Sequence, residues 1–166
     1  MLKKSWKRSE MLRSWVFWAA VPGLMTSPMI TTTLFFHQVH LVEIKSWDLS
    51  TYVLFIPAYS AATLFSLYLI GYLVDKLSTK IILPVFLFPL ISGLLLLSIA
   101  TSYLELFLIF ILLGLSAGAY IVVYGTFFPE FFGSLYLGSV RTVGVTIMVF
   151  SSCLLYTSDA ADERNS

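Results

Sequence analysis

A short charged segment between two long apolar stretches is the part of this sequence best suited to forming ion pairs. No charged residue occurs from 49 to 74, and none occurs from 81 to 104. Between these stretches lie Asp75, Lys76 and Lys80. Charged side chains at such a junction can form and break ion pairs when neighbouring elements move.

A second group of polar residues is suited to contact a small solute. Thr33 and His37 are four residues apart and share one face of a helix, and Gln38 follows them. Tyr120 and Tyr124 have the same spacing in a later apolar stretch. An imidazole within or beside a membrane can donate to a carboxylate or carry a proton. The alternative interpretation is that His37 lies in water and that the tyrosines anchor the chain at the membrane interface.

Composition indicates that these residues are carried by membrane-spanning helices. Hydrophobic residues make up 58% of the 166 residues and charged residues 11%, whereas a soluble domain has about 25% charged residues. A spanning helix needs about 20 mostly apolar residues, and continuous apolar stretches favour helices over a closed barrel. We therefore predict an all-α polytopic protein. The five candidate spans are 14–36, 49–74, 81–104, 106–129 and 138 to the mid-150s.

Small residues and prolines indicate how these helices pack. Gly114 and Gly118 are four residues apart, a spacing that lets two helix backbones approach closely. Pro84 and Pro89 in the third candidate span are typical of kinks. The short stretch 101–105 predicts a tight hairpin between the third and fourth spans. A polar loop is expected before Ser50.

The distribution of basic residues predicts the orientation in the membrane. With the first segment in the cytoplasm, eight basic residues lie inside and only Lys45 lies outside, which satisfies the positive-inside rule. The eight inner basic residues are Lys3, Lys4, Lys7, Arg8, Arg13, Lys76, Lys80 and Arg141. A cleaved secretory signal is the alternative for the N-terminus, but its apolar stretch is long and is followed by further spans. The net charge of +1 does not indicate nucleic-acid binding. We expect a lipid bilayer as the partner of the basic residues.

The last residues resemble the translation of a transposase adaptor used in sequencing libraries. The resemblance covers Cys153 to Glu163. The alternative is an ordinary polar tail. On the adaptor interpretation, native sequence ends near Ser152, residues 153–166 are foreign, the fifth span is truncated, and Cys153 carries no information about redox compartment.

The charged junction resembles the signature of the major facilitator superfamily, Gly-x-Leu-Ala-Asp-Arg-x-Gly-Arg-Lys. Gly71, Leu73, Asp75 and Lys80 match it directly, Val74 and Lys76 are conservative replacements, Ser78 replaces a glycine, and Thr79 replaces a basic residue. A second stretch with Glu130 and Arg141 resembles the loop entering the eleventh helix of prokaryotic members. The resemblance covers essentially all of residues 1–152.

The resemblance implies the C-terminal half of a secondary transporter. Residues 1–13 would then end the central cytoplasmic loop, and residues 14–152 would form helices seven to eleven of the family's bundle. The N-terminal half would be the missing partner. It further implies a small solute, such as a carboxylate, moved by alternating access, with a proton or counter-substrate as a coupling partner, and a bacterial inner (plasma) membrane as location.

The resemblance also places the signature aspartate in a cytoplasmic gate. We expect Asp75, Lys76, Lys80, Glu130 and Arg141 to form this charge network. Three of them, Asp75, Glu130 and Arg141, would hold the outward-open state. The alternative is that they are solvated loop charges with no coupling, since exposed pairs contribute only ~0–1 kcal/mol.

Other classes of function have less support in the sequence. There is no phosphate-binding loop and no nucleophile motif, so we expect neither an enzyme nor a cofactor. His37 and His40 lack a third metal ligand nearby, so no metal site is expected. The alternative to a transporter is a small integral membrane subunit for binding or assembly.

Overall fold

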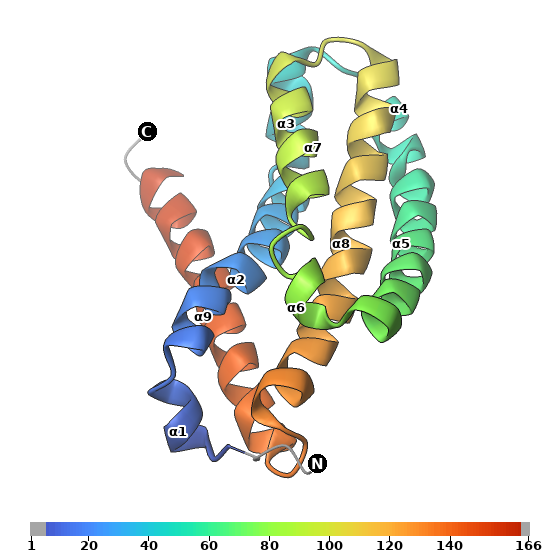
Figure 1. Cartoon of the computed structure of the whole chain (residues 1–166). Helices are drawn as coiled ribbons and strands as arrows, with labels where there is room; N and C mark the ends of the chain where they lie inside the picture. Colours follow the sequence, from blue (N-terminus) through green and yellow to red (C-terminus); the bar gives the residue numbers. More distant parts are fainter. Residues whose placement is uncertain (1–5, 164–166) are drawn as a thin grey trace. The chain divides into compact units, whose positions relative to one another are not determined.

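The computed structural model describes residues 6–163, and this part of the chain is helical without any strand (Figure 1). The all-α prediction is therefore confirmed. The helices are α1 (Arg8–Leu12), α2 (Trp15–Phe36), α3 (Gln38–Lys45), α4 (Leu49–Leu54), α5 (Ile56–Leu77), α6 (Thr79–Ile82), α7 (Phe88–Ile99), α8 (Tyr103–Phe132) and α9 (Leu137–Glu163).

Three helical segments of the described part are long and apolar enough to cross a membrane. They are Trp15–Phe36, Leu49–Leu77 and Tyr103–Phe132, and the second joins α4 to α5. Backbone groups in lipid must be satisfied within the segment, which a continuous helix achieves. These segments give the chain the character of an integral membrane protein.

The third candidate span is divided rather than continuous. The helix α6 ends at Ile82, a turn covers 83–87, and α7 has only 12 residues. Pro84 lies in the turn, and Pro89 occupies the first turn of α7. Proline lacks a backbone N–H and clashes with the preceding helical turn, so it is accepted at a helix start but not inside a regular helix. The kinks expected at these prolines are therefore a full break.

Two further segments differ from the expected pattern. The stretch between His40 and Ser50, expected as a polar loop, contains the second half of α3, and the C-cap residue Ser46 has φ 54° and ψ 35°. The last helix, α9, runs through the predicted junction near Ser152 without interruption. Its described apolar part is short, covering 137–147. The foreign origin of 153–166 stays a prediction, and 164–166 lie outside the described residues.

The chain forms two compact units. Unit 1 is formed by 1–33 with 127–166, and unit 2 by 34–126. Both α2 and α8 continue from one unit into the other.

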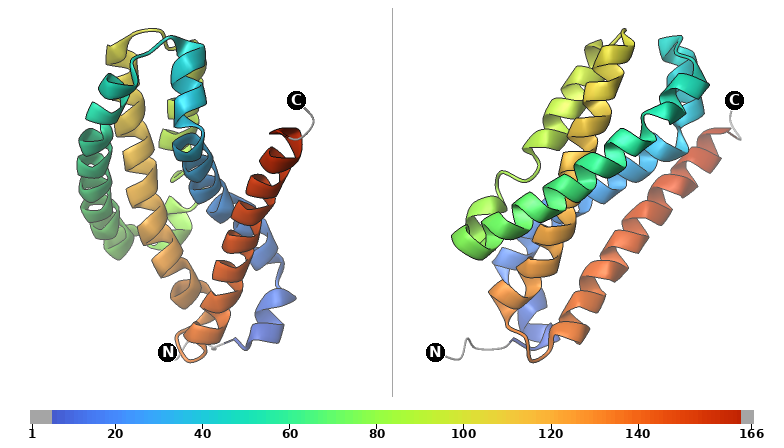
Figure 2. Two further views of the ribbon diagram at one scale, coloured as in Figure 1. Left: turned by 180° about the vertical axis from the view of Figure 1, so that it is seen from behind. Right: turned by 90° about the vertical axis from the view of Figure 1, so that its right-hand side faces the viewer.

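The core of unit 2 is the packing of α5 and α7 against α8. A short connection joins α7 to α8, and the two helices run side by side as the predicted hairpin (Figure 2). A Cβ added to Gly93 would stand 3.3 Å from Leu112 Cβ. The start of α8 is held by Glu105, whose carboxylate accepts hydrogen bonds from the N–H groups of Thr101 (2.7 Å) and Ser102 (2.8 Å).

The contact between α5 and α8 is close because two glycines lie in it. A Cβ on Gly114 would overlap the carbonyl of Tyr59, and one on Gly118 would stand 2.7 Å from Ser66 Cβ. Ser66 Oγ also donates to the carbonyl of Leu115 at 2.6 Å. Such close approach allows dispersion contacts and polar contacts between helix backbones, which dominate helix association in lipid.

Aromatic side chains form the core of unit 1. The ring of Phe132 meets those of Trp6 (5.9 Å between centroids), Phe17 (6.4 Å) and Phe127 (5.8 Å), each edge to face. Phe17, Phe127 and Phe132 are buried, as is Met11 of α1. This cluster ties the segment before α2 to the end of α8.

Candidate functional site

The charged junction lies at the turn between α5 and α6. The last helical residue of α5 is Leu77, and Ser78 has φ 76° and ψ 146°. Its N–H still donates to the carbonyl of Val74 at 2.9 Å. The next residue, Thr79, is fully buried and donates from its hydroxyl to Thr126 Oγ1 of α8 at 2.9 Å. The turn is thus anchored to α8 within unit 2.

The charged side chains of this turn face outward. Asp75, Lys76 and Lys80 are all exposed. Lys76 Nζ lies 4.4 Å from the centroid of the Tyr72 ring, a cation–π contact that contributes about 0.5–1 kcal/mol at an exposed site. Within the residues described, the carboxylate of Asp75 makes no hydrogen bond or ion pair. It is therefore available to an outside partner.

Gly71 and Leu73, the two uncharged residues of the junction that match the signature directly, differ in their surroundings. A Cβ added to Gly71 would meet nothing within 4 Å, so no close approach requires a glycine there. Leu73 is half-buried against its unit.

The remaining members of the predicted charge network belong to unit 1. Glu130 is half-buried in the last turn of α8, and Arg141 is exposed in the first turns of α9. Asp75 belongs to unit 2. The gate formed by these three residues accordingly stays a prediction.

The polar residues near the end of α2 are placed differently from one another. Thr33 donates to the carbonyl of Met29 at 3.0 Å, which satisfies its hydroxyl within α2. His37 is exposed at the break before α3. Gln38 is half-buried, and its Oε1 is enclosed and accepts no hydrogen bond from the described residues. A buried amide oxygen of this kind favours a donor such as water or a solute hydroxyl.

The two tyrosines of α8 lie together. The ring centroids of Tyr120 and Tyr124 are 5.5 Å apart, with the ring planes tilted by 37°. Tyr124 is buried and Tyr120 half-buried. Their shared face follows directly from their four-residue spacing.

A pocket in unit 2 has an apolar lining and holds none of the predicted solute contacts. Its interior offers about 10 Å³, which is close to the smallest space that accepts one water molecule. It is lined by Leu34, Leu41, Tyr52, Leu97, Leu106, Ile109, Phe110 and Leu113. This pocket is too small for an organic solute. Among the residues whose side chains the structure describes, no group of three His, Cys, Asp or Glu residues is arranged to hold a metal ion.

Sequence reasoning missed a set of polar contacts that joins two loops of unit 2, which we name the Lys45 clamp. Lys45 Nζ donates to the carbonyls of Ser98 (3.2 Å) and Ala100 (3.0 Å) at the end of α7. A cation satisfies the free carbonyls there and complements the helix dipole. The other contacts of the clamp are Trp47 Nε1 to the Thr101 carbonyl (3.1 Å) and Asp48 N–H to Tyr103 Oη (3.2 Å).

The two sides of the Lys45 clamp, 45–48 and 98–103, are separated by more than fifty residues along the chain. No local sequence pattern therefore reveals the contact. The one available signal was that Lys45 is the only basic residue on its predicted side of the membrane.

Comparison of the chain with protein-family models, with curated proteins and with solved structures gives no match.

Proposed function

We propose that this chain is part of an integral membrane secondary transporter of the major facilitator type. In this proposal it is the C-terminal half of the carrier, and an N-terminal half that precedes it in the same protein completes it. The solute is a small organic molecule such as a carboxylate, moved by alternating access with a proton or counter-substrate. The membrane is a bacterial inner membrane, and the first residues lie on its cytoplasmic side.

The backbone of Ser78 is the observation that supports this proposal most directly. The superfamily signature has glycine at this position. Here the residue has φ 76° and ψ 146°, a region that glycine enters far more readily than other residues. The turn therefore has the conformation that explains a glycine in the signature, although this chain carries a serine.

In the proposed mechanism, Asp75 is a switchable member of a cytoplasmic gate. Its carboxylate is exposed and uncommitted, whereas Lys76 already contacts Tyr72. An exposed ion pair contributes little, so the pair with Arg141 would become strong only when the two halves close and bury it. The conformation in which this pair closes the cytoplasmic side would then be the outward-open state.

The candidate solute contacts in this proposal belong to unit 2, except for Thr33, which belongs to unit 1. Gln38 offers an enclosed amide oxygen, and His37 offers an exposed imidazole. Thr33 is the weakest candidate because its hydroxyl already bonds to Met29. Tyr120 and Tyr124 would contribute hydroxyl and ring faces, and the N-terminal half would supply the opposite wall.

Transport assays on the complete carrier of this proposal, with its N-terminal half present, test the gate. We expect Asp75→Asn and Arg141→Gln each to reduce turnover about tenfold, the range of a typical coupling free energy. Glu43→Gln is the matched control, because it removes another exposed carboxylate of unit 2 that belongs to neither the gate nor a helix cap. Near-normal turnover in both gate variants would disprove the gate. We also expect residues 1–166 alone not to transport, and robust uptake by this chain in liposomes would contradict that.

The exposed surface of α5 favours a second candidate, a small membrane subunit that assembles with another protein. Leu64 is 70% exposed and Tyr68 is 79% exposed, so this apolar helix has a free side in unit 2. The nucleotide sequence distinguishes the two candidates. A reading frame that continues upstream into six more apolar spans, with adaptor sequence at its end, supports the transporter. A genuine stop codon without an adaptor match supports the subunit.

A further inference from the structure

The segment that precedes α2 presents basic and indole side chains on the surface of unit 1. Lys7, Arg8 and Arg13 are exposed, and none of them bonds to another described residue through its side chain. Just beyond them, Trp15 is 80% exposed and Trp18 is 55% exposed. Cationic and indole groups side by side are typical of the level of phospholipid headgroups.

This segment is held in place by contacts on its other side. Met11 is fully buried, and the N–H of Trp6 donates to the carbonyl of Phe132 at 2.9 Å. Trp18 Nε1 donates to the carbonyl of Leu12 at 2.8 Å, which links the start of α2 back to α1. The basic residues are thus displayed by a packed structure, not by a free tail.

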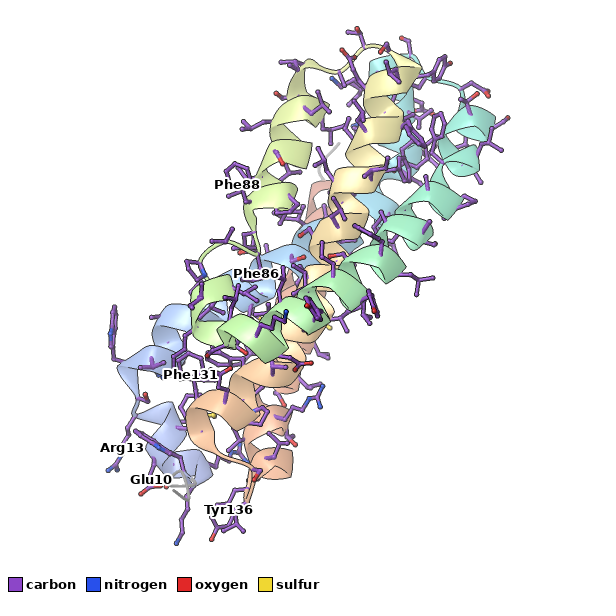
Figure 3. The ribbon with its side chains drawn as sticks, turned by 45° about the vertical axis from the view of Figure 1, so that its right-hand side comes forward. Glu10, Arg13, Phe86, Phe88, Phe131 and Tyr136 are labelled. Atoms are coloured by element: carbon purple, nitrogen blue, oxygen red, sulfur yellow. The ribbon has the colours of Figure 1, made fainter. Side chains whose placement is uncertain are left out.

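The one acidic residue of the segment is already engaged. Glu10 Oε2 accepts a hydrogen bond from the N–H of Lys7 at 2.8 Å and helps to begin α1. Figure 3 shows the side chains of Glu10, within α1, and Arg13, which directly follows α1. The three basic side chains therefore leave the segment with a net positive surface.

We propose that Lys7, Arg8 and Arg13, with Trp15 and Trp18, form a binding surface for the headgroups of anionic phospholipids. The ligand class is an anionic lipid in the bilayer leaflet on the side of residue 1. The guanidinium and ammonium groups bind the phosphate oxygens, and the two indoles lie at the boundary between headgroups and acyl chains. This inference uses the membrane character of the chain and is independent of whether the chain transports a solute.

Fluorescence quenching in nanodiscs tests the surface. The full chain carrying Trp6→Phe and Trp47→Phe retains Trp15 and Trp18 as reporters. It is placed in phosphatidylcholine discs with 20% phosphatidylglycerol. Two samples are compared, one in which only the phosphatidylcholine and one in which only the phosphatidylglycerol is brominated near the glycerol end of its acyl chains. We expect brominated phosphatidylglycerol to quench beyond its mole fraction, and 0.5 M salt to reduce this preference.

Charge-neutral variants locate the effect. Each Lys or Arg near an anionic surface changes lipid association by about fivefold. The triple variant Lys7→Gln, Arg8→Gln, Arg13→Gln is therefore expected to lose the preference, with unchanged helicity by circular dichroism. The matched control Lys76→Gln, Lys80→Gln removes basic charge from unit 2 and should keep it. Equal quenching by both lipids in the parent chain, or an unchanged preference in the triple variant, would overturn the proposal.

Discussion

Ser78 carries the α5–α6 turn through a backbone conformation that is costly for any residue with a side chain. With φ 76° and ψ 146° it lies in a region occupied almost only by glycine. The burial of Thr79 and its bond to Thr126 hold the turn in this conformation. Strain of this kind persists only where surrounding contacts stabilise it, and it is concentrated at sites that switch.

Replacing Ser78 by glycine is therefore expected to stabilise the protein. We expect Ser78→Gly to raise the free energy of unfolding by about 1 kcal/mol, because the strained backbone is relieved. Titration of the detergent-purified protein with a denaturing detergent, followed by circular dichroism, measures it. Ser60→Gly, the same substitution in the regular helix α5, should instead lose about 0.5–1 kcal/mol. A loss in Ser78→Gly of the same size as in the control would contradict this interpretation.

Asp48 gives the chain a pH-dependent contribution to stability. As the N-cap of α4 it accepts hydrogen bonds from Thr51 N–H (3.0 Å) and Thr51 Oγ1 (3.1 Å). These bonds to Thr51 lower the pKa of the Asp48 carboxyl below its ordinary value of 3.8. A depressed pKa means that the stabilisation is present above the ordinary value and is lost as the pH falls through the folded-state pKa.

The unfolding temperature of the Asp48→Asn variant should therefore depend on pH less strongly than that of the parent. We expect the parent to be the more stable at pH 7, and the difference to shrink as the pH falls below about 3.8. Thr51→Val keeps the backbone N–H but loses the hydroxyl, so it should retain part of the pH dependence. A difference that stays constant from pH 7 to pH 3 would rule out the ionised carboxylate as its source.

At the scale of elements, the approach of α5 to α8 depends on Gly114 and Gly118. The glycine spacing indicated a helix contact, but it did not identify the partner, because several predicted helices carry small residues. The structure assigns the contact to Tyr59, Thr63 and Ser66 of α5.

Two alanine substitutions in α8 distinguish a packing glycine from an ordinary one. Gly118→Ala should lower the stability by about 1–3 kcal/mol, because the new Cβ would overlap the carbonyl of Thr63 and crowd Ser66. Gly125→Ala adds a Cβ with nothing within 4 Å and should gain about 0.5–1 kcal/mol from the better helix propensity. If the two substitutions change the free energy of unfolding in the same direction relative to the parent, the close α5–α8 contact is refuted.

The broken third span shows what element prediction from composition leaves open. Its lack of charge identified a membrane segment, and its two prolines indicated kinks. The extent of the break was not predictable, because a proline in an apolar helix is accepted when other groups satisfy the freed carbonyl. Here Pro84 lies in a turn and Pro89 begins a new helix.

For the whole molecule, the prediction that can be tested first is its orientation in the membrane. We expect Glu43→Cys to react with a membrane-impermeant maleimide on intact bacterial cells, and Ser9→Cys to react only after the membrane is permeabilised. Both residues are exposed, and both variants are made with Cys153→Ser, which removes the one cysteine already in the sequence. The expectation follows from the excess of basic residues on the side of Ser9. The reverse labelling pattern, or identical labelling of both sites, would show that the orientation is wrong.

The sequence by itself determined that the chain is helical and membrane-embedded. Both properties depend on local composition: long stretches without charge enter lipid, and in lipid the backbone must bond within its own helix. The same local information located the charged residues 75–80 and the polar residues around His37, but not their partners.

Tertiary structure decided the contacts between residues distant along the chain. It brought Lys45 to the carbonyls at the end of α7, Thr79 to Thr126, and Trp6 to Phe132. It also left the carboxylate of Asp75 uncommitted within unit 2. These outcomes depend on how helices pack, and the energies of many weak contacts between side chains decide packing without leaving a periodic pattern in the sequence.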